Sequence, residues 1–296
     1  MPISNLVNRA KPNTVALETT LLVHGIPRER VCDVHDQLRD AVAAAGSHPA
    51  LVGIMAGQPV VGMTDDELAQ MLAQDDTPKV NRANLGVVLA RRQTGATTVS
   101  TTAELAHAAG VRVFATGGIG GVHRGYAQHL DISADLAAIA AHPAAVVTSG
   151  CKNILDIAAT REALETLGVP VVGYRTDTFP AFYQRSSGVA VDASFDAHAD
   201  LADFLAFELA RTGRGVVVCN PIPAEDEIPL DQWESWLAAA TAQATATGRD
   251  ATPEILAAVH RLSDGATVEA NIALARSNAA LAGALAAAMP ALSTGT

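Results

Sequence analysis

The sequence predicts an α/β protein: one domain with a three-layer α/β/α sandwich around a mostly parallel, mixed sheet. Short β-branched runs alternate along the chain with longer Ala- and Leu-rich amphipathic segments, as in a parallel sheet covered by helices on both faces. No repeat period and no linker-like stretch interrupts this alternation. We therefore expect a single domain over residues 1–296, with frayed tails at 1–12 and 289–296.

The first half of the chain contains both kinds of element. Thr14–Thr20, Leu51–Met55 and Val111–Ala115 are predicted strands, because each is a short apolar run. Glu29–Ala45 is a predicted helix with one apolar stripe, formed by Val31, Val34, Leu38 and Val42. A second helix begins at Thr64, which is followed three residues later by Glu67 in a capping-box pattern. Further helices are expected over Asn84–Arg92 and Ser100–Ala109.

The second half repeats the alternation and then ends in helices alone. Its β-branched runs predict strands over Ala144–Thr148, Val169–Tyr174 and Gly215–Asn220. Its Ala- and Leu-rich segments predict helices over Ala134–Ala141, near Ile154–Leu167, and over Ala199–Arg211, Leu230–Ala246, Thr252–Leu262 and Thr267–Ala288. The polar segment Gln184–Ser194 favours a surface loop.

The composition argues against several classes of function. The net charge of −11 opposes binding to a nucleic-acid polymer or an anionic membrane, because both need basic surface. No apolar run approaches the length of a membrane span, and the N-terminus has no signal-peptide core. Three distant cysteines without metal spacing favour a reducing compartment: Cys32, Cys151 and Cys219. We therefore expect a cytoplasmic protein.

Polar residues stand where the predicted strands end. In open parallel α/β folds, ligands bind at the carboxyl ends of strands. The residues at such ends are Glu18, Thr116, Thr148, Lys152 and Asn220. An amine, an acid and glycine-rich backbone at one edge suit a phosphorylated substrate and amine chemistry.

Lys152 and Glu18 are the candidate catalytic residues. Lys152 lies at a strand-to-helix junction among apolar neighbours, so we expect it to be partly buried, which disfavours the ammonium form and frees a nucleophile for imine formation. The alternative is a phosphate-binding or structural lysine, although a positive charge at a helix start opposes the helix dipole. Glu18 interrupts an apolar run, which suits either an ion pair or a general acid with a raised pKa.

The glycine-rich segment Gly117–Gly125 has two interpretations. Its backbone N–H groups, together with His123 and Arg124, suit a bound phosphate. Alternatively, the glycines serve a tight turn that needs positive φ. The segment matches neither the dinucleotide-binding fingerprint nor the Walker loop.

Two carboxylates, Asp131 and Asp135, follow the glycine-rich segment. On a helix they would share one face and suit a hard divalent ion such as Mn²⁺ or Mg²⁺. Alternatively, Asp131 or Ser133 caps the helix and Asp135 lies in its first turn. Lys79 is either a phosphate ligand or a solvated surface lysine. Ordinary hydrogen-bonding roles are expected for His24, Asn220, Asn271 and Asn278.

A series of segments resembles the pseudouridine-5′-phosphate glycosidase family, also called indigoidine synthase A-like. Over about Asn13–Leu285 the chain carries, in the family's order, Thr-Val-Ala-Leu-Glu-Thr-Thr, Gly-Ala-Thr-Thr-Val, Val-Phe-Ala-Thr-Gly-Gly-Ile-Gly-Gly-Val-His-Arg-Gly, Asp-Ile-Ser-Ala-Asp-Leu, Lys-Asn-Ile-Leu-Asp, Phe-Pro-Ala-Phe-Tyr and Asn-Pro-Ile-Pro. Such a series is far more specific than any single motif. The departures are Thr19 where Ser is usual, Arg82-Ala83-Asn84-Leu85 where Arg-Arg-Asp-Leu is usual, and Cys151-Lys152-Asn153 where Ala-Lys-Ser is usual.

The resemblance implies reversible cleavage of the bond between C1′ of ribose 5-phosphate and a ring carbon of uracil. It assigns imine formation to Lys152 and proton donation to Glu18, and Asp131 would hold a metal ion, usually Mn²⁺. Contacts with the substrate would come from Lys79, Val99, Ser133, Ala134, Asp135, Thr116, His123 and Asn271. The family forms homotrimers with an α/β/α architecture.

This activity fits the candidate residues. A C-glycoside has no leaving oxygen to protonate, so paired carboxylates alone do not cleave it. A proton from Glu18 would open the sugar ring, and Lys152 would capture C1′ as an imine that accepts electrons from the carbon–carbon bond. Two alternatives stay open: a C-glycosyl synthase that attaches ribose 5-phosphate to an aromatic polyketide in antibiotic biosynthesis, and a sugar-phosphate sensor without turnover.

Overall fold

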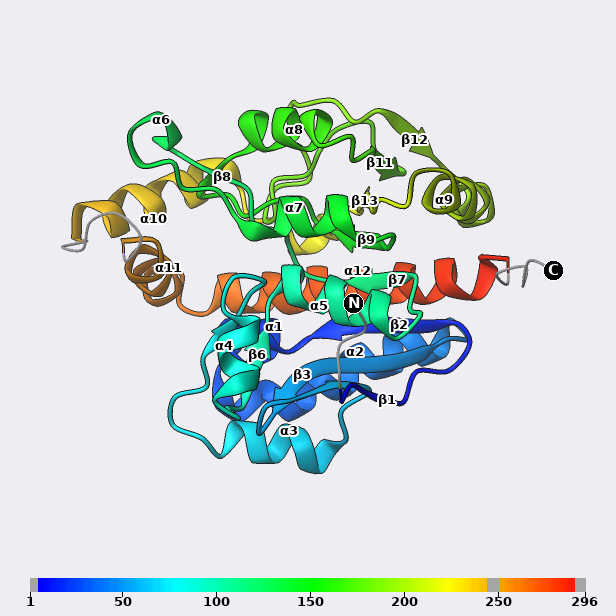
Figure 1. Cartoon of the computed structure of the whole chain (residues 1–296). Coiled ribbons are helices and arrows are strands. Elements are labelled where there is room, and N and C mark those ends of the chain that lie inside the picture. Colours follow the sequence, from blue (N-terminus) through cyan, green and yellow to red (C-terminus); the bar gives the residue numbers. More distant parts are fainter. Residues whose placement is uncertain (1–4, 244–250, 291–296) are drawn as a thin grey trace.

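A large, mostly parallel sheet forms the centre of the structure, a computed structural model that describes residues 5–243 and 251–290. Its strands are β1 (Val7–Asn8), β2 (Thr14–Glu18), β3 (His48–Met55), β4 (Gln58–Val61), β5 (Lys79–Val80), β6 (Gly95–Thr97), β7 (Val113–Ala115), β9 (Ala145–Thr148), β11 (Val171–Tyr174), β12 (Ala193–Phe195) and β13 (Val216–Cys219). They follow the order β1-β4-β3-β2-β7-β9-β13-β11-β12, with β6 beside β3 and β5 beside β6 (Figure 1).

Strand direction makes the sheet mixed. All neighbours from β3 through β2, β7, β9, β13 and β11 to β12 are parallel, whereas β4 and β6 run antiparallel to β3. A separate two-stranded antiparallel ribbon joins β8 (Val122–His123) to β10 (Leu155–Asp156). The central strands are rich in Val and Ala, because strands buried on both faces have no polar side to present.

Helices cover both faces of the sheet. Those of the described chain are α1 (Thr19–Gly25), α2 (Val31–Ala44), α3 (Asp65–Leu72), α4 (Leu85–Ala90), α5 (Val99–Ala108), α6 (Tyr126–His129), α7 (Ala134–Ala141), α8 (Ile157–Thr166), α9 (His198–Thr212), α10 (Leu230–Gln243), α11 (Ala251–Leu262) and α12 (Ala266–Ala288). Apolar residues of α2, α9 and α12 pack on one face, and those of α5, α7 and α8 on the other. The predicted three-layer α/β/α sandwich with a mostly parallel, mixed sheet is confirmed.

Alternation along each central strand supplies the two cores. In β7, Phe114 joins the core under α5 and α7, while Val113 and Ala115 join the core under α2 and α12. Period-two alternation of side chains across a strand produces this division. The sheet therefore separates two apolar layers, and the polar side chains of its central strands lie at the strand ends.

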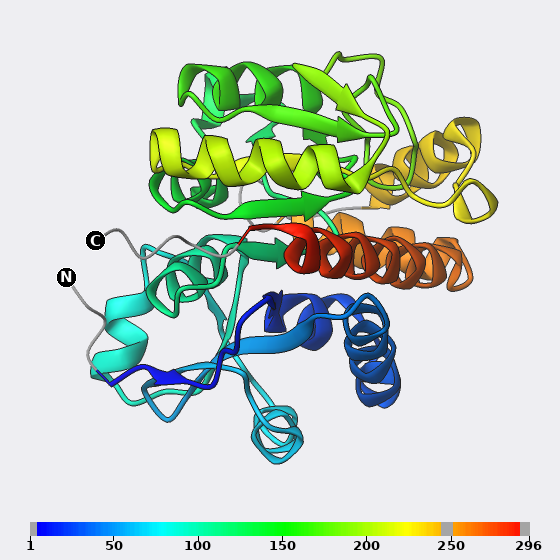
Figure 2. The ribbon, with the colours of Figure 1, turned by 90° about the vertical axis from the view of Figure 1, so that its right-hand side faces the viewer.

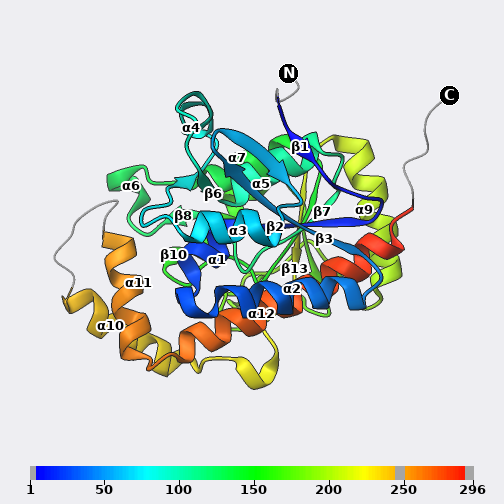
Figure 3. The same ribbon diagram turned by 90° about the horizontal axis from the view of Figure 1, so that it is seen from below.

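The long helix α12 crosses the middle of the molecule (Figure 2). It is rich in alanine and buries residues on every side, as expected for a helix enclosed in a core. It lies beside α2 (Figure 3), where a Cβ on Gly283 would come within 2.9 Å of the Val42 carbonyl oxygen. Glycine at this position therefore permits the close approach of the two helices.

Several predicted boundaries are corrected. Thr19 and Thr20 begin α1 and do not extend the first strand, and β4, β5, β6, β8, β10 and β12 were not expected. The N-terminal tail is not frayed from residue 5 onward, because β1 pairs with β4, and Met289 is buried. Residues 1–4, 291–296 and the end of the helix predicted over Leu230–Ala246 lie outside the described residues. No helix of the described chain is both long enough and apolar enough to cross a membrane.

Candidate functional site

The carboxyl ends of β2, β7, β9 and β13 bring the predicted polar residues into one row. Leu17 pairs with Ala115 and Ala115 with Val147, so Glu18, Thr116 and Thr148 follow side by side. Cys219 pairs with Thr148, which places Asn220 next in the row. This edge of the sheet is therefore the candidate active site, as the sequence predicted.

Glu18 is a buried acid at the end of β2. Burial raises its pKa from 4.5 to about 7, against opposing effects from the Thr116 hydroxyl and from the charges of Lys152 and Lys79. Thr116 Oγ1 donates a hydrogen bond of 2.5 Å to Glu18 Oε1. The buried Thr116 hydroxyl therefore orients the Glu18 carboxyl group, and the expected contact of Thr116 with the substrate stays a prediction. Near neutral pH, Glu18 is able both to give and to take a proton.

Two amines approach Glu18. The charges of Lys152 and Lys79 both act on its carboxyl group, and the same two ammonium groups repel each other. Partial burial, together with the charge of Lys152, lowers the pKa of Lys79. Asn84 Nδ2 donates to the Lys79 carbonyl oxygen at 3.0 Å and stabilises β5, the two-residue strand that contains Lys79. Lys79 is exposed, but its charge interacts with those of Glu18 and Lys152, which belong to the candidate site.

The prediction that Lys152 would be partly buried is wrong. The residue is exposed, while Cys151 and Asn153 on either side of it are buried. The physical reason is that the lysine stands on a loop beyond the end of β9 and projects from the edge of the sheet, whereas its neighbours face inward. The amine is therefore accessible to a ligand and close enough to Glu18 to influence it.

Asp135 acts as a brace. Its Oδ1 accepts the Ser100 N–H at 2.9 Å, and its Oδ2 accepts the Gly120 N–H at 2.9 Å. The carboxylate thus holds the first turn of α5, which begins at Val99, against the glycine-rich segment. The backbone at Val99 lies at a helix N-terminus, which favours anions.

The start of α7 settles the two interpretations of the acidic pair. Ser133 is the N-cap and accepts the Asp135 N–H, Ala134 is the first helical residue, and Asp135 lies in the first turn. Asp131 precedes the helix, so the interpretation that puts both acids on one helical face is wrong. The capping alternative, with Ser133 as the cap, is confirmed.

The glycine-rich segment owes its glycines to crowding. A Cβ on Gly120 would lie 2.3 Å from Ser133 Oγ, and one on Gly121 would lie 2.2 Å from Thr160 Oγ1. Of the glycines in this segment, only Gly125 has a positive φ, of 79°. The N–H groups of Ile119, Gly120, Val122 and His123 donate to acceptors within the protein. These four groups therefore do not form the phosphate cradle that the sequence suggested.

Asp131 and His123 form a carboxylate–imidazole pair on the hairpin that follows the glycines. His123 Nδ1 lies 3.6 Å from Asp131 Oδ2, and the His123 N–H donates to the Asp131 carbonyl oxygen. Both side chains are partly exposed. In the described part of the chain, no three His, Cys, Asp or Glu side chains gather as a ready metal centre. An oxygen donor with free access fits a hard divalent cation that keeps most of its water ligands.

The strand β8 connects this hairpin to the lysine loop. His123 pairs with Leu155 across the two-stranded ribbon, and Arg124 Nη2 donates to the Asn153 carbonyl oxygen at 3.3 Å. Among the described residues no hydrogen bond or ion pair joins Asp131 to Glu18 directly, but the ribbon places the Asp131 hairpin beside the segment that carries Lys152. The site therefore combines the Glu18 carboxyl group and the Lys152 amine with an adjoining hairpin that carries Asp131.

Buried asparagines support the edge of the sheet. Asn278 Nδ2 donates to the Thr116 carbonyl oxygen at 2.8 Å, and Asn278 Oδ1 accepts from Asn220 Nδ2 at 2.9 Å. Asn220 and Asn278 thus have the ordinary hydrogen-bonding roles that we expected. Asn271 differs: its side chain is buried and donates to the Gly25 carbonyl oxygen, yet its Oδ1 has no hydrogen-bond partner among the described residues. A Cβ on Gly117 would lie 3.2 Å from this oxygen, which places it at the site edge.

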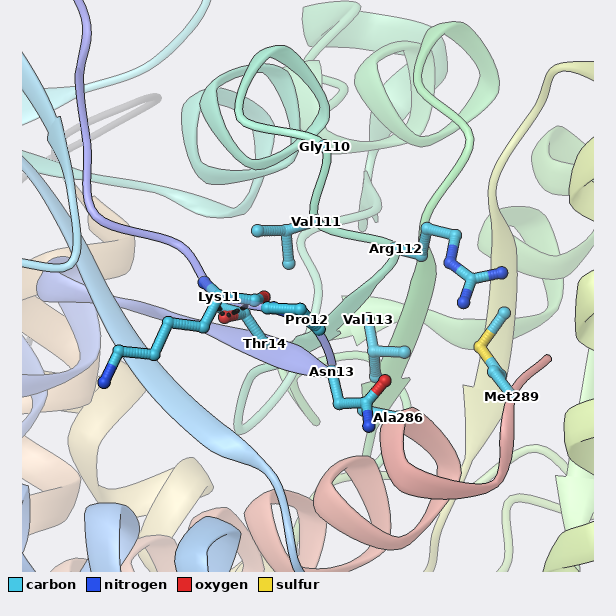
Figure 4. Close-up of a pocket in the computed structure, with 10 residues that line it drawn as sticks. All are labelled: Lys11, Pro12, Asn13, Thr14, Gly110, Val111, Arg112, Val113, Ala286 and Met289. Atoms are coloured by element: carbon cyan, nitrogen blue, oxygen red, sulfur yellow. Dashed lines mark hydrogen bonds between the residues drawn. The ribbon is translucent and has the colours of Figure 1, made fainter. Parts of the chain in front are cut away.

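A surface pocket at the opposite end of the strands is not part of this site. It is lined by the starts of β2 and β7 and the end of α12, including Lys11, Arg112 and Met289 (Figure 4). The side chains of Lys11 and Arg112 point in opposite directions, so the two cations do not converge on one ligand. Arg112 instead donates to the Pro290 carbonyl oxygen at 2.7 Å.

Some contacts within the site were not predicted from the sequence. Thr19 Oγ1 accepts the Thr97 N–H at 2.8 Å and fixes β6 next to Glu18. Asn153 and Gln184 form a buried amide pair beside Lys152. These contacts were not predictable from local sequence pattern, because each joins segments that are distant along the chain.

Comparison with known proteins identifies relatives over nearly the whole chain. The family described as "Indigoidine synthase A like protein" matches residues 3–288. A pseudouridine-5′-phosphate glycosidase from Nocardioides sp. is 44% identical over 277 residues, which are 92% of this chain and 90% of that protein. One from Solibacter usitatus is 43% identical over 283 residues, 94% of each chain.

Two solved structures share the fold. An indigoidine synthase A-like protein from Thermotoga maritima has a TM-score of 0.87 and 35% identity, with 95% of each chain covered. The prealnumycin C-glycosynthase AlnA, solved in complex with ribulose 5-phosphate, has a TM-score of 0.89 and 34% identity, with 97% of this chain and 98% of that one covered.

Proposed function

The chain belongs to the indigoidine synthase A-like family, and from this membership we propose that it cleaves and forms the carbon–carbon glycosidic bond of pseudouridine 5′-phosphate. The products of cleavage are ribose 5-phosphate and uracil. Relatives named for this glycosidase activity match more than nine-tenths of the chain. The observation that carries the proposal is the buried Glu18, with a pKa of about 7, between the charges of two lysines.

The proposed reaction uses Glu18 and Lys152 in turn. Protonated Glu18 gives its proton to the ring oxygen of the ribose, and the ring opens. The amine of Lys152 attacks C1′ and forms a C–N single bond. The carbon–carbon bond then breaks, its electrons leave with the base, and the lone pair of the lysine nitrogen completes the C1′=N imine. The base leaves as a stabilised carbanion and is protonated, and water then releases ribose 5-phosphate from the lysine.

Other residues of the edge hold the substrate in this proposal. Lys79 and the α5 start at Val99 bind the sugar phosphate, with the start of α7 beside them. Asn271 offers its unpartnered oxygen to an N–H of the base. Ser133, Ala134 and Asp135 support the same region through the cap of α7 and the brace to α5.

We assign the metal site to Asp131, with His123 holding its carboxylate. A bound Mn²⁺ or similar divalent cation would supply positive charge for the phosphate oxygens. Asp131 and His123 themselves keep an oxygen donor exposed at the hairpin, next to the ribbon that leads to Lys152. A homotrimeric assembly and a cytoplasmic location belong to the same proposal.

A C-glycosyl synthase is the second candidate function. The neighbour AlnA, a prealnumycin C-glycosynthase, matches 97% of this chain with a TM-score of 0.89. A synthase would use the same lysine and sugar phosphate with a larger aromatic acceptor, such as a polyketide. Uracil is favoured because the relatives named as glycosidases are the more similar in sequence, at 43–44% identity against 34%.

Incubation with ribose 5-phosphate and uracil tests the proposed function. We expect pseudouridine 5′-phosphate, detected by chromatography and mass spectrometry. An imine adduct without this product, but with product from an aromatic acceptor, would favour the synthase. Ribose 5-phosphate binding without any adduct would favour a sensor that does not turn over its ligand.

Replacement of Asp131 tests the cation assignment. The Asp131→Ala variant should lose at least about tenfold in activity and should no longer respond to added Mn²⁺, because the proposed oxygen ligand is gone. Calorimetric titration should show the same loss as weaker Mn²⁺ binding. Asp40→Ala, at an exposed position on α2, is the control. An unchanged Mn²⁺ response in Asp131→Ala would move the metal site elsewhere.

Replacement of Lys79 tests the phosphate contact. The Lys79→Ala variant should raise KM for the phosphorylated sugar by roughly 10-fold to 100-fold, because a charge-assisted hydrogen bond is lost. Steady-state kinetics measure this change, with Lys11→Ala as a control at the opposite end of β2. If KM stays at the parent value, Lys79 does not bind the phosphate.

A further inference from the structure

The loop that carries Lys152 is locked to a distant segment of the chain, residues 179–184. Gly150 has a φ of 84°, and a Cβ there would lie 1.8 Å from the Pro180 carbonyl oxygen. The Phe182 N–H donates to the Ser149 carbonyl oxygen at 2.8 Å, and Gly150 forms an isolated bridge with Ala181. The backbone before Lys152 is therefore clamped against this segment.

Asn153 clamps the backbone on the other side of Lys152. Its Oδ1 accepts the Tyr183 N–H at 3.2 Å, and its Nδ2 donates to Gln184 Oε1. Gln184 Nε2 donates in turn to the Ile228 carbonyl oxygen at 3.1 Å, which leads from the lysine loop to the segment before α10. Asn153 and Gln184 are buried, so their amide groups depend on these partners. The sequence predicted a surface loop that begins at Gln184. This prediction is wrong for Gln184, which is buried.

Backbone strain marks the same segment. Phe182 is a bulky residue with a φ of 59°, in the left-handed region that such residues rarely adopt. A Cβ on Gly118 would meet the Phe182 ring at 2.5 Å, and Tyr183 packs edge-on against the ring at 4.7 Å between centroids. Strain of this kind persists where the surroundings hold it, and it gathers at functional sites.

Lys152 itself is exposed, so packing of its own side chain does not fix its direction. Its position is set by the two buried residues that flank it and by their partners. Since imine formation requires the amine to approach one carbon along a narrow path, a displacement of about 1 Å can cost about 100-fold in rate.

We propose that Asn153 and Gln184 are positioning residues, whose buried amide pair aims Lys152 at the sugar carbon. This role rests on the proposed imine function and deepens it. The positioning role also accounts for the Phe-Pro-Ala-Phe-Tyr-Gln segment at 179–184. None of these residues takes part in the proposed chemistry itself. The same role explains a departure from the family pattern, because asparagine at 153 reaches Gln184, whereas the shorter serine would not.

Gln184→Met tests the proposal, because methionine has nearly the same size but makes neither hydrogen bond. The rate at which ribose 5-phosphate becomes trapped on the protein by borohydride, followed by intact mass, should fall about 10-fold to 100-fold. KM for the phosphorylated sugar should stay within about twofold, since Lys79 and α5 are untouched. Thr176→Val is the matched control, because it removes a hydrogen bond from Thr176 to the Thr178 carbonyl oxygen in the preceding part of the same loop.

A conservative variant separates positioning from general destabilisation. Protonated glutamic acid can accept a hydrogen bond from Asn153 and donate one to the Ile228 carbonyl oxygen, as glutamine does. The rate of borohydride trapping in Gln184→Glu, relative to the parent, should therefore rise as the pH falls. A folded Gln184→Met protein that is trapped at the parent rate would overturn the proposal. If the parent itself formed no adduct, the proposed imine function would fail instead, so the two failures are distinguishable.

Discussion

Replacement of Lys152 by alanine should abolish turnover. The chain has three lysines, Lys11, Lys79 and Lys152, and only Lys152 is assigned as the nucleophile. Loss of a covalent nucleophile removes the whole imine route, so the rate should fall by at least about 10³-fold. Steady-state assays with ribose 5-phosphate and uracil measure this effect.

The Lys152→Ala protein should remain folded, because the side chain that is removed is exposed. Its free energy of unfolding should lie within about 0.5 kcal/mol of the parent value. Lys11→Ala, at the opposite end of the sheet, should keep full activity. Full residual turnover in a folded Lys152→Ala protein would refute the imine mechanism.

Glu18→Gln should have the second largest effect on activity. Loss of a general acid typically costs about 10²-fold to 10⁴-fold in rate. Since burial raises the pKa of Glu18 to about 7, the parent rate should fall as the pH rises above 7 and the acid becomes ionised. Glu18→Gln should lack this pH dependence, whereas Glu208→Gln, which changes a buried acid on the distant α9, should retain it. A Glu18→Gln profile that still falls above pH 7 would assign the proton to another group.

The same substitution should change the pH dependence of stability. The pKa of Glu18 is raised from its ordinary 4.5 to about 7, so the folded state favours the neutral acid. Its contribution to stability is complete below pH 4.5 and is lost as the pH rises to 7. Relative to the parent, Glu18→Gln should therefore gain about 3 kcal/mol in free energy of unfolding between pH 4 and pH 8, measured by urea titration. An equal difference at both pH values would mean that Glu18 ionises freely in the folded protein.

The layers of the fold and the composition of the site edge were predictable from the sequence, because both follow from local pattern. The helix over Ala134–Ala141 has the predicted boundaries, and Thr64 forms its predicted capping box with Glu67. Parallel strands must end at one edge, so the proximity of Glu18 to Thr116 followed from two apolar runs. The two-residue strands β8 and β10 were not predictable, because such short segments have no period to recognise.

The detailed environment of each side chain was not predictable in the same way. Whether Lys152 is buried depends on how a loop turns beyond the end of β9, and apolar neighbours in sequence do not decide that. Asp135 binds Ser100, 35 residues away, and Asn153 binds Gln184, 31 residues away. These partners are chosen by tertiary packing, so only the folded chain reveals that Asp135 is a brace and that Asn153 holds the lysine loop.

Reductive trapping with peptide mapping tests the central claim most directly. The protein is incubated with ribose 5-phosphate and borohydride, digested, and examined by mass spectrometry for the pentose phosphate adduct. With three lysines in the chain, the modified residue can be assigned without ambiguity. The imine mechanism predicts one adduct, on Lys152. An adduct on Lys79, whose pKa is lowered beside Lys152, or no adduct at all, would contradict it.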